Sequence, residues 1–222
     1  MKLHGGLERL SAERVSAEMR SLLVAPQAMR AVAALLDYGQ LVGLLGGVPR
    51  LARFERLVAI EEALGVEPEA MPRLAALGVF VQEDASRLAA RLRLSNAERA
   101  VLELGAAEPS ELPDGNAAKC ALYRLGSSDF ARHVLLAWAD SGAGPEDKAW
   151  RAALALPERW KAPAFPLRGA DIMALGGLRG PEVGEKLRRL EAEWIAGGFS
   201  ASREDLLARA AALSRKSPRQ DR

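Results

Sequence analysis

A glycine-rich stretch toward the C-terminal end of the chain has the composition of an anion-binding helix start. The segment ALGGLRGPEVGEKLRRLEAEWI, residues 174–195, places four glycines and one proline around the start of an amphipathic, charged helix. Pro181 suits the first helical position, with Gly180 as the cap before it. The next N–H groups then have no partner within the helix and can donate to a phosphate oxygen. They belong to Glu182, Val183 and Gly184.

Two positive charges accompany this helix start. Arg179 precedes the proline and Lys186 lies one turn into the predicted helix, so both are candidate phosphate contacts. A purely structural interpretation is also open, because glycines permit tight turns and close packing of helices. The helix mixes glutamates with its basic residues, so it has no broad basic face. This favours a phosphate contact confined to the start of the helix.

A second basic cluster begins in a stretch without acidic residues, Ala85 to Ala97. Its members are Arg87, Arg91, Arg93 and Arg99. Arg87 and Arg91 are one helical turn apart and share a face. The cluster predicts either contacts with RNA or an ordinary solvated face. A weaker candidate, close in sequence to several glutamates, comprises Arg50, Arg53 and Arg56.

Aromatic residues offer a third kind of contact, because unpaired bases stack on aromatic rings. The four tryptophans are Trp138, Trp150, Trp160 and Trp194. Trp194 continues an apolar helical stripe with Leu187 and Leu190, which predicts a core position. Trp160 lies in a proline-rich stretch and is the tryptophan for which exposure is most plausible.

Residues needed for several kinds of catalysis are missing. No P-loop or G-x-G-x-x-G motif follows a predicted strand. His4 and His133 are the only histidines and neither adjoins an aspartate, so we expect a solvated His4 and a partly packed His133. Carboxylates such as Glu191 and Glu193 point about 200° apart on a helix and cannot share a metal ion. We therefore expect no catalytic residue and no metal site in this chain.

Composition indicates a helical protein. The 222 residues include no threonine and three isoleucines, so β-branched residues are too few for a sizeable sheet. The net charge is +2, but the basic residues are mostly arginine, which suits forked contacts with phosphate. Cys120 is the only cysteine, which excludes an intramolecular disulfide. Without a membrane-length apolar run or a recognisable signal peptide, we expect a cytoplasmic chain with no membrane partner.

Helix signals recur along the chain with short breaks between them. Capping residues mark three starts: Ser11, Ser95 with Glu98, and Ser202 with Asp205. Helices are expected over residues 12–24, 26–39, 51–64, 116–125, 129–138 and 145–156. Two more are expected within residues 84–104. Toward the C-terminal end we expect a short helix around Asp171, a long helix from Pro181 and a final helix after Ser202. Residues 68–83 have weak periodicity and predict a connection or short helices. The stretch PERWKAPAFP, residues 157–166, predicts a linker.

Three stretches, in their order and spacing, add a family resemblance. They are LSAERVSAEMRSLL (residues 10–23), RLRLSNAERAVLEL (91–104) and FPLRGADIMALGGLRGPEVGEKLRRLEAEWI (165–195). Together they resemble the C-terminal half of bacterial CCA-adding tRNA nucleotidyltransferases and the related poly(A) polymerases. The last stretch is the most specific, and the resemblance extends over nearly the whole chain.

The resemblance implies an all-α, elongated array of small helical modules. The remainder of a neck would occupy residues 1–81, a helical body 82–162, and a helical tail with the glycine loop 163–222. In the family these parts hold the tRNA while a catalytic head adds nucleotides. The head's nucleotide loop, its D-x-D or E-x-D metal pair and the E-D-x-x-R motif of the neck have no counterpart here. The resemblance therefore implies a chain inactive alone, whose head, in cis or in trans, would use Mg²⁺, CTP and ATP.

We expect this chain to bind the acceptor and T-arm region of tRNA through shape and phosphates rather than base sequence. The sequence leaves open whether the parent enzyme adds CCA, part of CCA or poly(A), and it leaves open the oligomeric state. The alternative is a helical protein-interaction module or a separate subunit that pairs with a catalytic chain. A small hydrolase is disfavoured by the missing metal ligands.

Overall fold

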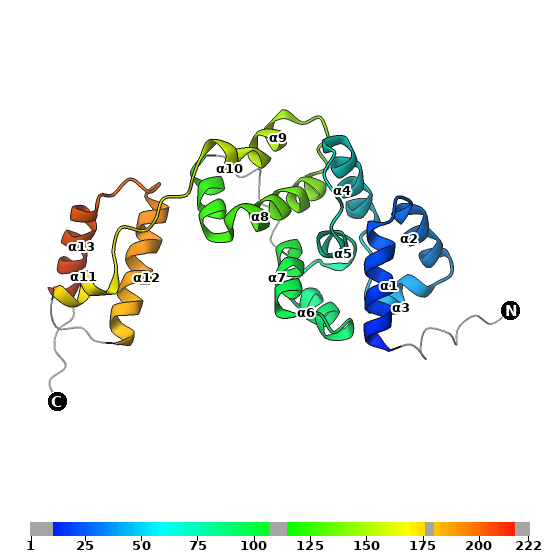
Figure 1. Ribbon diagram of the computed structural model, residues 1–222, viewed down its shortest axis with the longest axis horizontal. Coiled ribbons are helices and arrows are strands. Elements are labelled where there is room, and N and C mark those ends of the chain that lie inside the picture. The colour runs from blue at the N-terminus through cyan, green and yellow to red at the C-terminus, as the bar shows by residue number, and fades with distance from the viewer. Residues whose placement is uncertain (1–10, 107–114, 176–179, 216–222) are drawn as a thin grey trace. The chain divides into compact units, whose positions relative to one another are not determined.

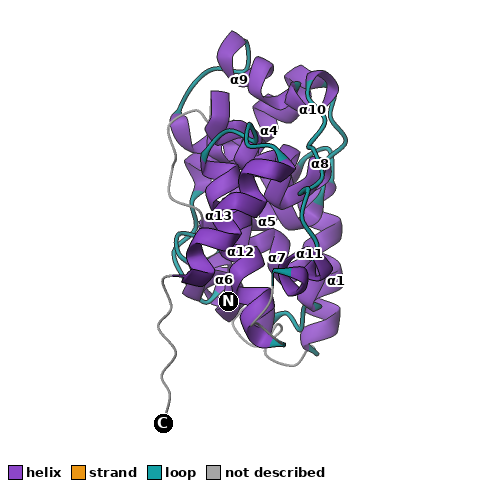
Figure 2. Cartoon of the chain, turned by 90° about the vertical axis from the view of Figure 1, so that its left-hand side faces the viewer, coloured by secondary structure: helices purple, strands orange, loops and turns teal. Residues whose placement is uncertain are grey.

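The computed structural model describes residues 11–106, 115–175 and 180–215, and all its regular elements are helices (Figures 1 and 2). The predicted all-α fold is confirmed. The helices are α1 (Ala12–Val24), α2 (Ala28–Asp37), α3 (Gln40–Leu45), α4 (Leu51–Leu64), α5 (Ala70–Gly78), α6 (Gln82–Arg91), α7 (Asn96–Glu103), α8 (Gly115–Ser141), α9 (Lys148–Leu154), α10 (Leu156–Arg159), α11 (Gly169–Ala174), α12 (Pro181–Ala196) and α13 (Arg203–Arg215). A 3₁₀ turn, η2 (Leu104–Ala106), follows α7.

The predicted helix starts are confirmed by their hydrogen bonds. Ser11 Oγ accepts from the backbone N–H three residues later, at 3.3 Å. At α7, Ser95 Oγ accepts from Glu98 N at 3.3 Å while Glu98 Oε2 accepts from Ser95 N at 2.9 Å. Ser202 and Asp205 make the same reciprocal pair before α13, at 3.1 and 3.0 Å. These capping boxes satisfy N–H groups that the helices themselves leave open.

Helix α5 occupies the stretch that was expected to be a connection or short helices. Every residue from Pro72 to Gly78 is buried, and α5 packs against α1, α4, α6 and α7. A helix enclosed on all sides carries no single apolar stripe, so its sequence shows little periodicity. A further helix that was not predicted is α3, which lies between Gly39 (φ 68°) and Gly46 (φ 67°).

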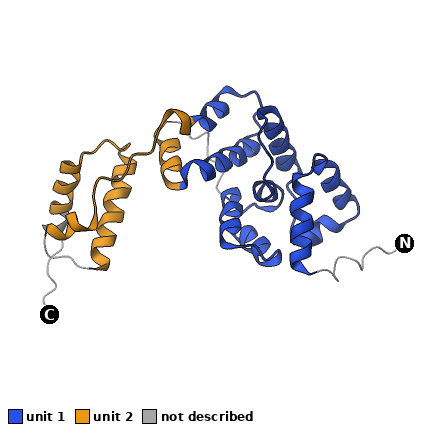
Figure 3. Cartoon of the chain, in the orientation of Figure 1, with its two compact units in different colours: residues 1–113, 125–155 blue, residues 114–124, 156–222 orange. Residues whose placement is uncertain are grey.

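The chain forms two compact units, coloured separately in Figure 3. Unit 1 comprises residues 1–113 and 125–155, and unit 2 comprises residues 114–124 and 156–222. Helix α8 contributes to both and is kinked at Gly126, which has φ 73° and ψ 170°. The kink separates two segments that match the helices predicted over 116–125 and 129–138. Within unit 1, α5 packs on both α6 and α7, so contacts cross the predicted boundary at 81/82. The division into neck, body and tail stays a prediction.

Three arginines in the first turns of α4 and at its N-cap tie unit 1 together. Arg53 is 2% exposed and donates to the carbonyls of Val79, Gly105 and Leu136, at 3.2, 2.9 and 3.4 Å. Its Nη2 also lies 2.8 Å from Asp140 Oδ2, and burial lowers its pKa to about 10. The other two donate nearby: Arg50 to Asp140 Oδ1 at 2.6 Å and Arg56 to the carbonyl of Ala139. This weaker basic candidate therefore holds α4 to the C-terminal end of α8.

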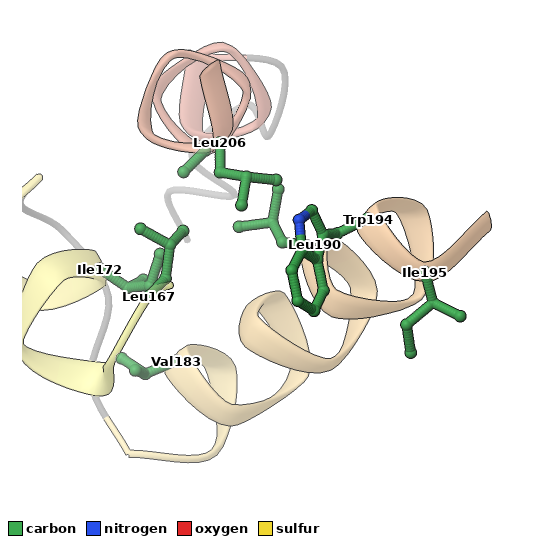
Figure 4. Close-up of a cluster of buried hydrophobic side chains, with 8 residues drawn as sticks. Leu167, Ile172, Val183, Leu190, Trp194, Ile195 and Leu206 are labelled. Atoms are coloured by element: carbon green, nitrogen blue, oxygen red, sulfur yellow. The ribbon is translucent and has the colours of Figure 1, made fainter. Parts of the chain in front are cut away.

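Unit 2 has its own apolar core, built around α12 (Figure 4). Leu190 and Trp194 of α12 face Leu206 of α13, while Ile172 of α11 lies beside Val183 (Figure 4). The predicted apolar stripe is confirmed, because these α12 residues are buried and Leu187 is partly buried against them. The first turns of α8 close the other end, where the side chains of Asn116 and Cys120 donate to the carbonyl of Ile195.

Candidate functional site

The start of α12 has the backbone predicted from its sequence. Pro181 occupies the first turn and Gly180 is the cap. Gly180 has φ 56° and ψ −122°, a conformation that favours glycine because other residues carry a Cβ. Helix α12 spans 16 residues, so its N-terminal end carries the positive end of a well-developed dipole. Arg179, Gly176 and Gly177 lie outside the described residues.

Gly184 lies on an open side of this helix. A Cβ built at Gly184 or at Gly180 would meet no described atom within 4 Å. Close helix packing within the described residues therefore does not explain these two glycines. Glu182 is exposed in the first turn, whereas Val183 is 7% exposed and belongs to the core. Because Gly180 is the cap, its carbonyl is the acceptor for the N–H of Gly184, so the predicted donors that stay open are those of Glu182 and Val183. Gly184 contributes space beside them for an approaching sugar-phosphate backbone.

Lys186 is turned away from that open side. Two residues along a helix differ by about 200° in direction, so Lys186 and Gly184 lie on nearly opposite faces. The Lys186 side chain is 8% exposed, and burial lowers its pKa because water no longer stabilises the charged form. The residue one turn after Gly184 is Arg188, which is exposed and makes no ion pair within the part of the chain that the structure describes.

Arg188 is thus a candidate phosphate contact that the sequence analysis missed. The i,i+4 spacing from Gly184 was the available signal. Its neighbour Arg189 differs, because its Nε lies 3.2 Å from Glu193 Oε1. The open face of α12 is defined here by Gly180, Gly184 and Arg188. It combines free space, a helix start and one positive charge that no described carboxylate neutralises.

The four arginines of the middle cluster all have partners in unit 1. Arg87 pairs with Asp84 at 2.6 Å, Arg93 with Glu13, and Arg99 with Glu103 at 2.8 Å. Arg91 alone among them donates to backbone carbonyls, those of Leu44 at 2.9 Å and of Gly43. These carbonyls end α3, where a helix leaves acceptors unpaired. Arg87 and Arg91 do share a side, since both have Cδ atoms 3.6 Å from a Cβ built at Gly46.

We expect Arg91→Ala to lower the free energy of unfolding by about 1 kcal/mol, the usual net value of a lost hydrogen-bonding partner. The cause is the loss of two donors to the end of α3. Urea denaturation followed by circular dichroism measures the change. Arg99→Ala is the matched control, because it removes only an exposed i,i+4 ion pair and should change stability by less than about 0.5 kcal/mol. Equal effects of the two variants would contradict a capping role for Arg91.

Three of the four tryptophans are buried. Trp138 and Trp150 stack on each other, with ring centroids 6.1 Å apart. Trp194 is 3% exposed, which confirms the predicted core position. Trp160 is partly exposed, packs against Phe199 with ring centroids 5.2 Å apart, and has Lys119 Nζ 5.7 Å from its ring centroid. No pattern in the sequence predicted this neighbour, because Lys119 lies on α8, far from Trp160 along the chain.

The two units differ in charge. By sequence, unit 2 holds 15 Lys and Arg against 10 Asp and Glu, a net charge of +5. Unit 1 holds 16 against 19, a net charge of −3. The total of +2 therefore combines a basic and an acidic unit. Since phosphate binding follows the local field, it is favoured on unit 2.

The described residues contain no group of three or more His, Cys, Asp or Glu side chains placed to hold a metal ion. His133 is partly buried as predicted, and burial lowers its pKa; His4 lies outside the described residues. None of the helices in the described ranges is both long and apolar enough to cross a membrane.

Unit 1 carries an open apolar groove on its first helices. Its volume is about 410 Å³, and it is lined mainly by Val15, Met19, Leu22, Leu35 and Leu44. A second depression of about 540 Å³ lies over the buried pair of Arg73 and Glu61, whose Nε and Oε2 atoms are 2.7 Å apart. Neither contains a cluster of catalytic side chains among the described residues.

No family model matches the chain. Over 225 aligned residues the chain is 24% identical to the mouse (Mus musculus) protein "CCA tRNA nucleotidyltransferase 1, mitochondrial" and 23% identical to the human (Homo sapiens) protein of that name. Each alignment covers 91% of this chain and 46% of the relative, so the chain spans about half the length of these curated relatives. It is also 42% identical over 86 residues to an uncharacterised 28 kDa protein encoded 5′ of petA in Rhodospirillum rubrum, covering 34% of this chain and 33% of that protein. The similarity to the two mammalian proteins supports the resemblance to CCA tRNA nucleotidyltransferases.

Proposed function

We propose that this chain is a tRNA-binding part of a CCA tRNA nucleotidyltransferase or poly(A) polymerase system. The observation that carries the proposal is the similarity, along 91% of the chain, to two proteins named as CCA tRNA nucleotidyltransferases. The all-helical fold and the charge of +5 on unit 2 agree with an RNA-binding role. The chain supports nucleotide addition at the tRNA 3′ end by holding the acceptor and T-arm region.

The open face of α12 binds a phosphate of the RNA backbone. Backbone N–H groups at a helix start, the dipole of α12 and the Arg188 guanidinium all favour an anion there. Gly180 and Gly184 leave room for the sugar-phosphate chain. Arg179 is proposed as a further contact, whereas Lys186 contributes through its field rather than as an exposed donor.

The middle cluster supplies a second contact, in which Arg91 has the main role. Arg87, Arg93 and Arg99 are each neutralised by a carboxylate, so their net attraction for phosphate is small. Arg91 binds only carbonyls among the described residues, so no described carboxylate offsets its charge. A guanidinium has five N–H donors, so the two contacts with α3 leave others for a phosphate.

Catalysis is assigned to a head domain in cis or in trans. Nucleotidyl transfer by two metal ions needs carboxylates that converge on one point. No such group occurs among the described side chains. Mg²⁺, CTP and ATP are therefore proposed as ligands of the head, and the chain is proposed to reside in the cytoplasm.

Titration of the full chain with fluorescein-labelled tRNA, at several salt concentrations, tests the proposal. We expect tRNA to bind more tightly than a DNA hairpin of equal charge, and the logarithm of the affinity to fall with the logarithm of salt by about 0.7–0.9 per phosphate contacted. In the same preparation, CTP, ATP and Mg²⁺ should give no extension of tRNA. Equal affinity for the DNA hairpin, or no binding at low salt, would overturn the proposal.

The apolar groove of unit 1 favours a second candidate function, that of a subunit pairing with a separate catalytic chain. Exposed apolar grooves of this kind accept helices of protein partners. Leu22→Glu would place a charge at a partly exposed position of the groove and should abolish co-purification with a co-expressed catalytic chain while leaving tRNA binding unchanged. Co-purification unaffected by this variant would exclude the groove as the pairing surface.

A further inference from the structure

We propose that Trp160 and Lys119 form a platform on which one unpaired base of the bound RNA stacks. This inference rests on the proposed RNA-binding function and adds to it a base contact that phosphate recognition by α12 does not include. The platform lies within unit 2, where the end of α10 meets the first turns of α8. It is distinct from the open face of α12.

The indole of Trp160 is held in place by its backbone and by a neighbouring ring. Its backbone N–H donates to the carbonyl of Leu156 at 2.9 Å, which fixes the residue at the end of α10. Its ring is tilted 52° from the ring of Phe199, with centroids 5.2 Å apart. Phe199 in turn packs edge-on against buried Trp194, with centroids 5.0 Å apart. The ring is therefore anchored to the core of unit 2 yet remains partly exposed.

The surroundings of the indole suit a nucleotide. Lys119 Nζ lies over the indole ring, 5.7 Å from its centroid, which is within range of a cation–π contact. An incoming base takes the place of this flexible side chain over the ring, and the ammonium then pairs with the phosphate of that nucleotide. Lys161 is exposed next to Trp160 in the chain, with exposed Glu158 as the nearest acidic residue in sequence. The net charge of +5 on unit 2 attracts a polyanion rather than an apolar peptide.

The ligand must be an unpaired base. A base inside a double helix has both faces covered by its neighbours, whereas a base in a loop, bulge or 3′ end can offer one face to an aromatic ring. Stacking does not depend on base identity, because every base has a π-face. The platform therefore recognises an unstacked nucleotide at a fixed place on the RNA without reading its sequence.

Tryptophan emission gives a direct test, because Trp138, Trp150 and Trp194 are buried and Trp160 is partly exposed. The probes are two RNA stem-loops that differ at one bulged position, which holds either adenosine or an abasic sugar. We expect the adenosine RNA to quench emission more strongly and to bind about five-fold or more tightly than the abasic RNA. Trp160→Phe, which preserves an aromatic ring in the Phe199 contact, should remove the difference in quenching, and Trp160→Ala the difference in affinity.

Matched variants distinguish loss of the platform from the general effect of removing any tryptophan or any positive charge. Trp150→Phe changes a buried tryptophan of unit 1 and should keep both differences. Lys119→Ala should weaken binding of the adenosine RNA and lower its salt slope by about one unit, whereas exposed Lys148→Ala in unit 1 should not. Equal quenching and equal affinity for the two RNAs would overturn the platform and leave the proposed function intact. No binding of either RNA, nor of tRNA, would overturn both.

Discussion

Replacing Asp140 by alanine is expected to lower the free energy of unfolding by about 3–5 kcal/mol, the usual loss when one partner of a buried ion pair is removed. The Asp140 side chain is 7% exposed and is shared by Arg50 and Arg53, at 2.6 and 2.8 Å. Without it, Arg53 would keep its carbonyl partners but lose its counter-charge in an environment that already lowers its pKa to about 10. Urea denaturation followed by far-UV circular dichroism gives the free energy.

Two further variants show whether burial causes the loss at Asp140. Asp140→Asn keeps the size of the side chain and some hydrogen bonding, so an intermediate loss is expected. Glu146→Ala removes the carboxylate that Arg151 contacts at 2.8 Å, but this glutamate side chain is 82% exposed. The Glu146 change should therefore stay within about 1 kcal/mol, as for other surface pairs. An Asp140→Ala loss as small as that of Glu146→Ala would mean that unit 1 does not depend on this ion pair.

Replacing Gly184 by valine is expected to weaken tRNA binding by about ten-fold or more, since it places a branched side chain where a backbone phosphate would approach. The fold should be unaffected, because a Cβ at this position meets no described atom within 4 Å. Valine also has a higher helix propensity than glycine, by a few tenths of a kcal/mol, so stability should rise slightly while affinity falls. Fluorescence anisotropy with labelled tRNA and thermal unfolding measure the two effects.

Adjacent arginines provide the control for the open face of α12. Arg188→Ala should weaken tRNA binding and reduce the salt slope by about one unit, because Arg188 shares the face of Gly184. Arg189→Ala removes the same charge from the next position, which is paired with Glu193, and should have a smaller effect. To test the charge of Lys186, we prefer Lys186→Met to Lys186→Glu. The Lys186 side chain is 8% exposed, and a buried carboxylate at this position would disturb the core of unit 2. Full tRNA affinity in both Gly184→Val and Arg188→Ala would remove this face from the proposed interface.

The starts and ends of the helices could be predicted from the sequence because they depend on neighbouring residues. A serine three residues before an acidic residue sets a capping box at α7 and again at α13. Gly180 and Pro181 set the start of α12 in the same way. The stripe that leads to Trp194 could also be predicted, because a helix with one buried face keeps a period of about 3.6 residues.

The environment of each arginine could not be predicted, because a long side chain reaches groups that are distant in the sequence. Arg53 meets carbonyls contributed by three later segments, and Arg91 meets the end of α3. In the sequence both look like members of basic clusters. Only the tertiary structure distinguishes an arginine that stabilises the fold from one, such as Arg188, that is left facing solvent.

The sequence by itself determined that the chain is helical, where most helices begin and end, and which residues form the stripe of α12, because these properties depend on contacts within a few residues. The tertiary structure decided that α5 is enclosed on all sides, that Lys186 is buried and that Lys119 meets Trp160. It also decided that residues 114–124 join the basic unit, which gives that unit its charge of +5. These properties depend on which helices pack together, and packing unites segments whose separation along the chain carries no local signal.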